Sequence, residues 1–151
     1  MLYYFRVIKM TKSTNELGFE LNHTEDIHKY IIENNAEFDS KKFTDFLQGL
    51  IKERRKTKKE IASESCMSEP FLYDILSNRK KPKRDSILKL SFGLRLNIIK
   101  TERLLMLAGH SQFYPRYMRD SLIFNARQNN MTIMEAEQLL TRYGHSLISE
   151  E

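Results

Sequence analysis

Residues 57–78 constrain the fold more than any other stretch, because they read as two short helices separated by a tight turn. Ile61 and Ala62 form the apolar seam of the first helix. The second helix repeats apolar residues at the one-, three- and four-residue steps of a single helix face. These residues are Phe71, Leu72, Ile75 and Leu76. The sequence therefore predicts a pair of short helices near the middle of the chain.

The ends of these two helices are also marked in the sequence. Ser68 can cap the second helix through its hydroxyl, and Pro70 falls in the first turn, where a missing backbone N–H costs little. The connection between the helices, residues 65–67, is only a few residues long. A connection this short makes the helices cross steeply, so the second is expected to project from the surface.

Positive charge gathers around the same stretch. Residues 41–84 carry thirteen basic and six acidic side chains, whereas residues 1–40 carry four and seven. Lysines and arginines that neutralise phosphates supply affinity for nucleic acid without reading its sequence. A solvated basic surface is the alternative, but the charge coincides with the predicted helical pair, which favours nucleic-acid binding.

The same residues resemble a known family. Residues 59–62, 67–68 and 73–82 are similar to the phage-repressor-like, or XRE-type, helix-turn-helix regulators of bacteria and their mobile elements. In that family a small alanine lets the second helix pack close, and serine or threonine caps it; Ala62 and Ser68 match. Asn78 stands where glycine is commonest, and asparagine tolerates a positive φ. The resemblance covers about residues 43–96 and continues more loosely to residue 120.

The resemblance implies an all-α, repressor-like helix-turn-helix bundle of about five helices, with extra N-terminal and C-terminal helices. It also implies that the second helix reads bases in the major groove of double-stranded DNA. Carried onto this sequence, the base-contacting positions are Ser68, Glu69, Pro70, Tyr73 and Asp74. The basic clusters on either side are expected to contact phosphates. They comprise Arg54, Arg55, Lys56, Lys58, Lys59, Arg79, Lys80, Lys81 and Lys83.

Three of the base-contacting positions have alternative interpretations. Glu69 can accept a hydrogen bond from cytosine, but a carboxylate in the first turn also stabilises the positive end of a helix. Asp74 can pair with Arg79 or Lys80 instead of facing DNA. Tyr73 can contact a phosphate or a thymine methyl group, or it can be a partly buried ring.

The rest of the chain reads as helices around this pair. Residues 11–22 are predicted to be a loop or linker, and a short helix capped by Thr24 is expected to run to about Asn34, burying Ile27, Tyr30 and Ile31. Further helices are expected over residues 40–54, 85–96, 97–109, 117–128 and 132–144.

This pattern suggests three parts. They are an N-terminal arm with a short helix (1–38), a DNA-binding domain (39–109) and a C-terminal extension (110–151). The helices of the extension are too short to be stable alone, so they should pack on the domain or on a second copy as a dimer interface. Residues 1–10 could form a strand, a loose arm, or an extension upstream of a start at Met10.

Enzymatic chemistry is not expected. The histidines have no acid or cysteine partners at metal-ligand spacing, and five glycines form no phosphate loop, so neither a cofactor nor a metal is predicted. Cys66 is the only cysteine, which suits a reducing cytoplasm. It is expected to be a buried filler between the two helices, although basic neighbours could make it a thiol sensor. No segment of about 20 apolar residues is available to cross a membrane, and no signal peptide is expected.

Two functions from different classes remain. The favoured one is a sequence-specific transcription regulator, dimeric and bound to two half-sites. The other is a protein-interaction module, antitoxin-like or an adaptor, that uses the same helices to hold a partner protein. Acidic residues in the second helix favour the protein-interaction module, and the flanking basic residues favour the regulator.

Overall fold

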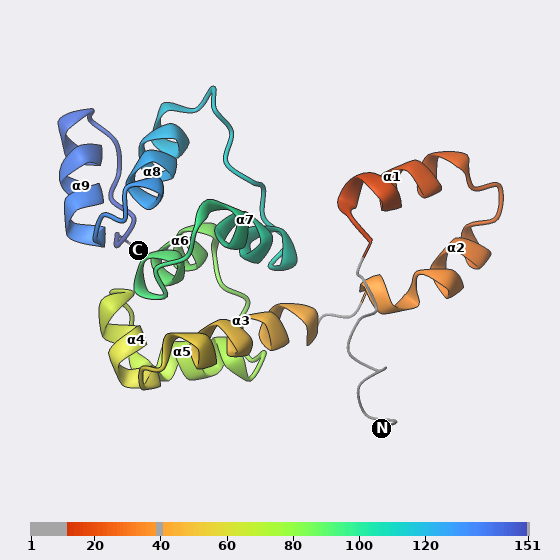
Figure 1. Cartoon of the computed structure of the whole chain (residues 1–151), viewed down its shortest axis with the longest axis horizontal. Coiled ribbons are helices and arrows are strands. Elements are labelled where there is room, and N and C mark those ends of the chain that lie inside the picture. The colour runs from red at the N-terminus through yellow and green to blue at the C-terminus, as the bar shows by residue number, and fades with distance from the viewer. Residues whose placement is uncertain (1–11, 39–40, 151) are drawn as a thin grey trace. The chain divides into compact units, whose positions relative to one another are not determined.

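The computed structural model describes residues 12–38 and 41–150, and the regular secondary structure of this part of the chain is all helical, without a strand. It divides into two compact units, residues 1–40 and 41–151 (Figure 1). The first unit contains α1 (Thr14–His23), α2 (Ile27–Glu33) and a short 3₁₀ helix (Asn35–Phe38). The second contains α3 (Lys41–Arg54), α4 (Lys58–Glu64), α5 (Glu69–Leu76), α6 (Arg84–Gly93), α7 (Ile98–Leu107), α8 (Met118–Gln128) and α9 (Ile133–Arg142). The all-α prediction is confirmed for these residues.

The first unit is a helical hairpin, and the loop predicted over residues 11–22 is wrong. Ser13 starts α1 through a capping box: its hydroxyl accepts from the Glu16 backbone at 3.1 Å, and the Glu16 carboxylate accepts from the Ser13 backbone at 2.6 Å. The backbone N–H of Ser13, and after it the Ser13 hydroxyl, hold the pKa of the Glu16 carboxylate below its ordinary value. The helix was missed because it buries no side chain and so has no apolar stripe.

The second helix of the hairpin also differs from expectation in its cap and its burial. Asp26, not Thr24, caps α2, accepting from the backbone of His28 at 3.0 Å and of Lys29 at 3.3 Å. Of the expected apolar stripe only Tyr30 is buried, and Ile27 and Ile31 remain about half exposed. Asp26 is the cap, and not Thr24, because its carboxylate lies directly before the first helical turn. There both its negative charge and its acceptor geometry suit the free backbone N–H groups.

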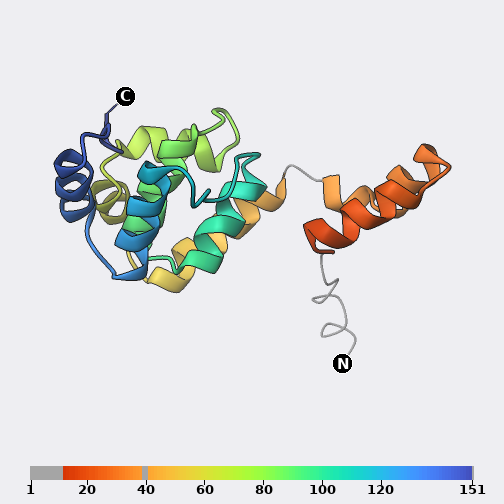
Figure 2. The ribbon, with the colours of Figure 1, turned by 90° about the horizontal axis from the view of Figure 1, so that it is seen from above.

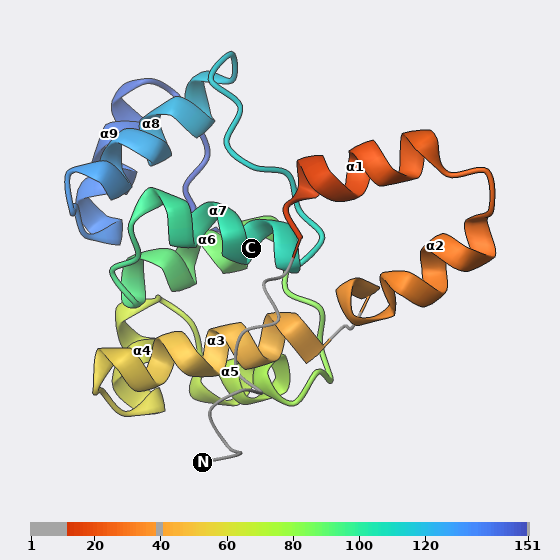
Figure 3. The same cartoon turned by 45° about the vertical axis from the view of Figure 1, so that its right-hand side comes forward.

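The second unit is built around α6. Every residue from Ser86 to Gly93 is buried, and α6 packs against both α4 and α7. Figure 3 shows α6 between α7 and the layer that contains α3 and α4. The helix ends at Gly93, earlier than the predicted Leu96, because Arg95 adopts a left-handed φ of 50°. Leu94 and Leu96 are nevertheless buried in the core from the turn that follows.

The C-terminal helices pack on the rest of the second unit. Contacts join α7 to α8 and α8 to α9, and Ile123, Ala126, Ile133 and Leu140 belong to the same core as α3–α7. Thr132 begins α9 through a capping box with Glu135. Gly109 and Gly144 follow α7 and α9 in the left-handed conformation, with φ of 81° and 74°. The expectation for residues 1–10 lies outside the described residues.

Candidate nucleic-acid interface

The first helix of the central pair begins at a strong cap. The Thr57 hydroxyl accepts from the Glu60 backbone at 3.1 Å, and the Glu60 carboxylate accepts from the Thr57 backbone at 2.8 Å. The backbone and hydroxyl of Thr57 together hold the pKa of Glu60 below its ordinary value. Ile61 and Ala62 are fully buried, as expected for the seam that faces the neighbouring helices. The cap fixes where α4 starts, and Lys58 and Lys59 lie exposed in its first turn.

The turn between α4 and α5 is closed by the backbone. The Met67 N–H donates to the Ala62 carbonyl at 3.0 Å, across a Cys66 that has a φ of 50°. Cys66 is exposed, so the expectation of a buried cysteine between the helices is wrong. The left-handed backbone at Cys66 turns the chain there, and the preceding residue, Ser65, is the one that is fully buried.

The second helix presents one buried face and one open face. The Ser68 hydroxyl accepts from the Phe71 backbone at 3.3 Å, so the predicted N-cap is present. Leu72, Ile75 and Leu76 are buried. On the open face, Ser68, Pro70 and Tyr73 are exposed, whereas Glu69 is half-buried in the first turn. Four of the five candidate base contacts therefore lie together at the start of α5.

The fifth candidate, Asp74, is engaged by cations from the following loop. Its carboxylate lies 3.4 Å from Lys80 Nζ and 3.9 Å from an Arg79 guanidinium nitrogen. This is the intramolecular pairing that the sequence offered as the alternative to a DNA contact. The negative charge within α5 is thereby neutralised from its own flanking loop, which removes part of the repulsion that a nearby phosphate would meet.

Cations also lie over the aromatic rings of α5. Lys58 Nζ is 5.0 Å from the centre of the Tyr73 ring, and Lys80 Nζ is 5.7 Å from the centre of the Phe71 ring. Tyr73 is 45% exposed, so its ring lies at the surface and is partly covered. Cations thus border α5 on two sides, with Lys58 on the α4 side and Arg79 and Lys80 on the side of the following loop. These three residues are here called the cationic rim. Figure 2 shows α5 and that loop along one edge of the second unit.

The loop after α5 is held in place. Asn78 adopts a φ of 59°, the left-handed conformation expected of it. Pro82 is buried, and its carbonyl accepts a hydrogen bond from His110 Nε2 at 2.8 Å, which makes Nε2 the protonated nitrogen. Lys81 and Lys83, on either side of this anchored proline, are exposed.

The basic cluster before α4 splits into two kinds of side chain. Arg54 and Lys56 both pair with Glu64 at the end of α4, Arg54 at 3.7 Å, and both are partly buried. Arg55 is exposed and has a φ of 53°. Of the nine candidate phosphate contacts, Arg54 and Lys56 are therefore directed to a carboxylate of the protein, and they are not brought to the cationic rim.

Arg84, the first residue of α6, is directed into the protein and not toward the cationic rim. It forms a two-pronged ion pair with Asp120 at 2.8 and 2.9 Å and also donates to the carbonyls of Ser111 and Gln112. Arg119 forms the reciprocal pair with Asp85 at 3.1 and 2.9 Å. The arginine of each Arg-Asp dipeptide thus pairs with the aspartate of the other, and the two pairs join α8 to the start of α6. The repeat of this dipeptide at 84–85 and 119–120 is the sequence feature that could have indicated the pairing.

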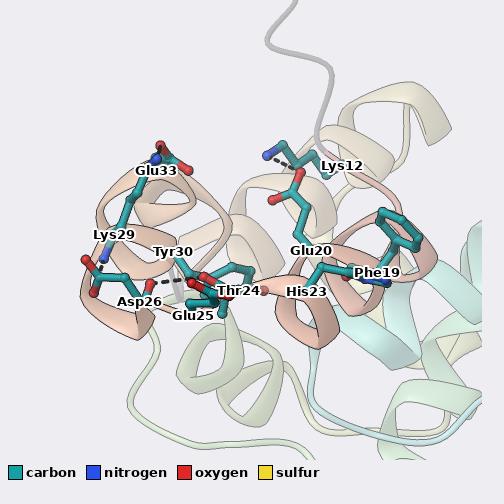
Figure 4. Close-up of a pocket in the computed structure, with 10 residues that line it drawn as sticks. All are labelled: Lys12, Phe19, Glu20, His23, Thr24, Glu25, Asp26, Lys29, Tyr30 and Glu33. Atoms are coloured by element: carbon teal, nitrogen blue, oxygen red, sulfur yellow. Dashed lines mark hydrogen bonds and ion pairs between the residues drawn. The ribbon is translucent and has the colours of Figure 1, made fainter.

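A cavity of about 590 Å³ lies elsewhere, between α1 and α2 (Figure 4). Its charged groups are largely paired with each other, as in the Lys12–Glu20 contact at 2.6 Å and the Lys29–Glu33 contact at 3.8 Å. Among the described residues no cluster of three histidine, cysteine or acidic side chains could hold a metal ion. No helix in the described ranges is both long and apolar enough to span a bilayer.

No protein-family model, curated protein or solved structure matches this chain. Its function is therefore inferred from its own residues and their geometry.

Proposed function

We propose that this protein is a sequence-specific DNA-binding transcription regulator with a repressor-like helix-turn-helix, in which α4 and α5 are the two helices of the motif. The observation that carries the proposal is the open face of α5. Ser68, Pro70 and Tyr73 are exposed on it, and the cationic rim borders it on both sides. An exposed helix N-terminus flanked by cations suits a groove lined by phosphates.

The residues have two main roles. The base-reading set comprises Ser68, Glu69, Pro70 and Tyr73. The phosphate-binding set comprises Arg55, Lys58, Lys59, Arg79, Lys80, Lys81 and Lys83. Asp74 serves mainly to hold Arg79 and Lys80 in position. Arg54 and Lys56 leave the phosphate-binding set because both are partly buried and paired with Glu64, whereas Arg79 and Lys80 pair with Asp74 but stay largely exposed. Phosphate contacts fix the register of the protein on the duplex, and base contacts select the sequence.

The proposal includes a homodimer, because two copies can occupy two half-sites about one helical turn apart on DNA. Binding of a protein partner is the second candidate function, and the first unit favours it. Phe19, Ile32 and Phe38 are more than half exposed there, and none of the residues of α1 is fully buried. Exposed apolar side chains gathered in one small unit are typical of surfaces that bind other proteins.

Selection of bound fragments from random duplex DNA should return a common sequence. Tyr73→Ala is expected to change the selected sequence at one position, lowering discrimination there roughly 5- to 150-fold, because a mismatched base pair in a specific site costs about 1–3 kcal/mol. Tyr143→Ala is the matched control, since Tyr143 is 55% exposed and lies at the end of α9, away from α5.

The measurement is sequencing of the bound pool, with affinities for the wild-type and altered sites. Wild-type protein that enriches no sequence would contradict a regulator. Tyr73→Ala that selects the wild-type sequence unchanged would remove Tyr73 from the base-reading set.

A further inference from the structure

A small cavity of about 210 Å³ lies between α7, the segment that follows it and α8. Figure 1 shows this segment running from the end of α7 to the start of α8. The cavity is lined by Glu102 of α7, by Phe113, Tyr114 and Pro115 of the connecting segment, and by Asp120 and Phe124 of α8. It is separate from the open face of α5, so the proposed DNA contacts do not account for it.

The walls of the cavity are aromatic. The Phe113 and Phe124 rings meet edge to face, with centres 5.6 Å apart and planes at 85°. Tyr114 is about half exposed and packs in the same manner on Tyr117, with centres 4.8 Å apart. Aromatic faces carry partial negative charge and attract cations, while their area favours apolar groups. These walls therefore suit a ligand that is both apolar and positively charged.

One cation of the protein already lies beside the cavity, because the Arg84 guanidinium is 5.8 Å from the centre of the Phe113 ring, but it is paired with Asp120. Both oxygens of Asp120 are already used, by the Arg84 guanidinium and by the Tyr114 backbone N–H at 2.9 Å. The carboxylate of Glu102, by contrast, has no ion-pair or hydrogen-bond partner among the described residues. It is half-buried beside the aromatic walls. One uncompensated negative charge is thus available to a ligand.

We infer that this cavity binds a small organic ammonium ion, with Phe113, Tyr114 and Phe124 packing around its alkyl groups and Glu102 supplying the counter-charge. The volume sets the size, because it is smaller than the roughly 300–1,000 Å³ of sites for drug-sized ligands. An ammonium ion that carries methyl groups matches the site best. It is positively charged and apolar at once, and it needs no hydrogen-bond acceptor from the aromatic walls.

The test uses choline and its neutral analogue, in which a quaternary carbon replaces the ammonium nitrogen. Titration calorimetry on the full chain should show choline binding about tenfold tighter than the analogue. Glu102→Gln should weaken choline about tenfold and leave the neutral analogue unchanged, because the side chain keeps its shape and loses its charge. Tyr114→Leu should weaken choline about threefold through loss of one ring.

Glu25→Gln is the control, since it removes the same charge from an exposed position in the first unit, outside the cavity, and should leave choline affinity unchanged. The inference is overturned by any of three results: no choline binding at about 10 mM, equal affinity for choline and its neutral analogue, or full choline affinity in Glu102→Gln. Because binding is measured directly, the outcome does not depend on whether the protein binds DNA.

Discussion

Asp120→Ala is expected to lower the free energy of unfolding by about 3–5 kcal/mol, the largest effect of any single substitution outside the apolar core. The Asp120 side chain is 8% exposed and accepts two hydrogen bonds from Arg84 and one from the Tyr114 backbone. Removing it leaves the Arg84 guanidinium, which is 22% exposed, without its counter-charge. Chemical denaturation followed by circular dichroism measures the change.

Asp85→Ala is the matched control for this experiment. Asp85 pairs with Arg119 in the same two-pronged geometry, but its side chain is 35% exposed, so water can replace much of the lost interaction. We expect a loss of about 1 kcal/mol. Equal losses at Asp85 and Asp120 would show that burial does not govern the strength of the two pairs. A negligible loss at Asp120 would mean that α8 is held to α6 by apolar packing alone.

Gly93→Ala is expected to cost about 3 kcal/mol of stability, because α4 and α6 touch at this glycine. A Cβ atom at Gly93 would lie 1.8 Å from the Ser65 hydroxyl oxygen, 2.9 Å from Ser65 Cβ and 3.0 Å from the Ile61 carbonyl oxygen. Ser65 is fully buried, so rotating its hydroxyl away does not make enough room. The two helices must separate, and α4 carries the turn that positions α5. Denaturant unfolding measures the loss of stability.

The control is Gly49→Ala. Gly49 lies within α3, and a Cβ atom there would meet nothing within 4 Å. Alanine is the better helix former by about 0.5–1 kcal/mol, so this variant should be slightly more stable than the wild type. The two glycine substitutions are thus predicted to have opposite signs. A Gly93→Ala protein as stable as the wild type would refute the close approach of α4 and α6.

Sequence reasoning predicted those helices whose ends carry caps and whose buried faces repeat. Ser68, Asn97 and Thr132 each cap the helix that follows, and Leu72, Ile75 and Leu76 are buried as their spacing indicated. Both signals are local, because a cap acts within one turn and a helix face repeats within two. They can therefore be read without knowledge of the fold.

Interactions between distant residues were not predicted, because nothing local marks them. Arg127 is the clearest example: its side chain is almost fully buried, stacks 4.6 Å from the centre of the Phe92 ring, and donates to the carbonyls of Leu96 and Met131. Burial, with Arg95 nearby, lowers the pKa of Arg127 to about 10. From sequence alone an arginine is expected at the surface, so the position of Arg127 in the core could not be predicted.

In the candidate site, too, the local features were predictable and the contacts between distant residues were not. The positions of Ser68, Pro70 and Tyr73 followed from the capped helix, and the pairing of Asp74 was one of the alternatives that the sequence offered. The separation of Arg54 and Lys56 from the other cations was not predictable. It depends on Glu64, eight or more residues further along the chain, coming within ion-pair distance after α4 has folded.

The salt dependence of affinity for duplex DNA tests the regulator proposal most directly. A protein whose cations bind phosphates should lose affinity linearly on a log–log plot, with a slope of about −0.9 for each phosphate contact. Lys81→Ala combined with Lys83→Ala should lower the magnitude of that slope by about 1.8 for each bound protomer. Arg116→Ala with Arg142→Ala removes the same charge from exposed positions outside the proposed interface, and should leave the slope unchanged. The absence of a complex with duplex DNA at low salt, or an equal change of slope in both double variants, would contradict the proposal.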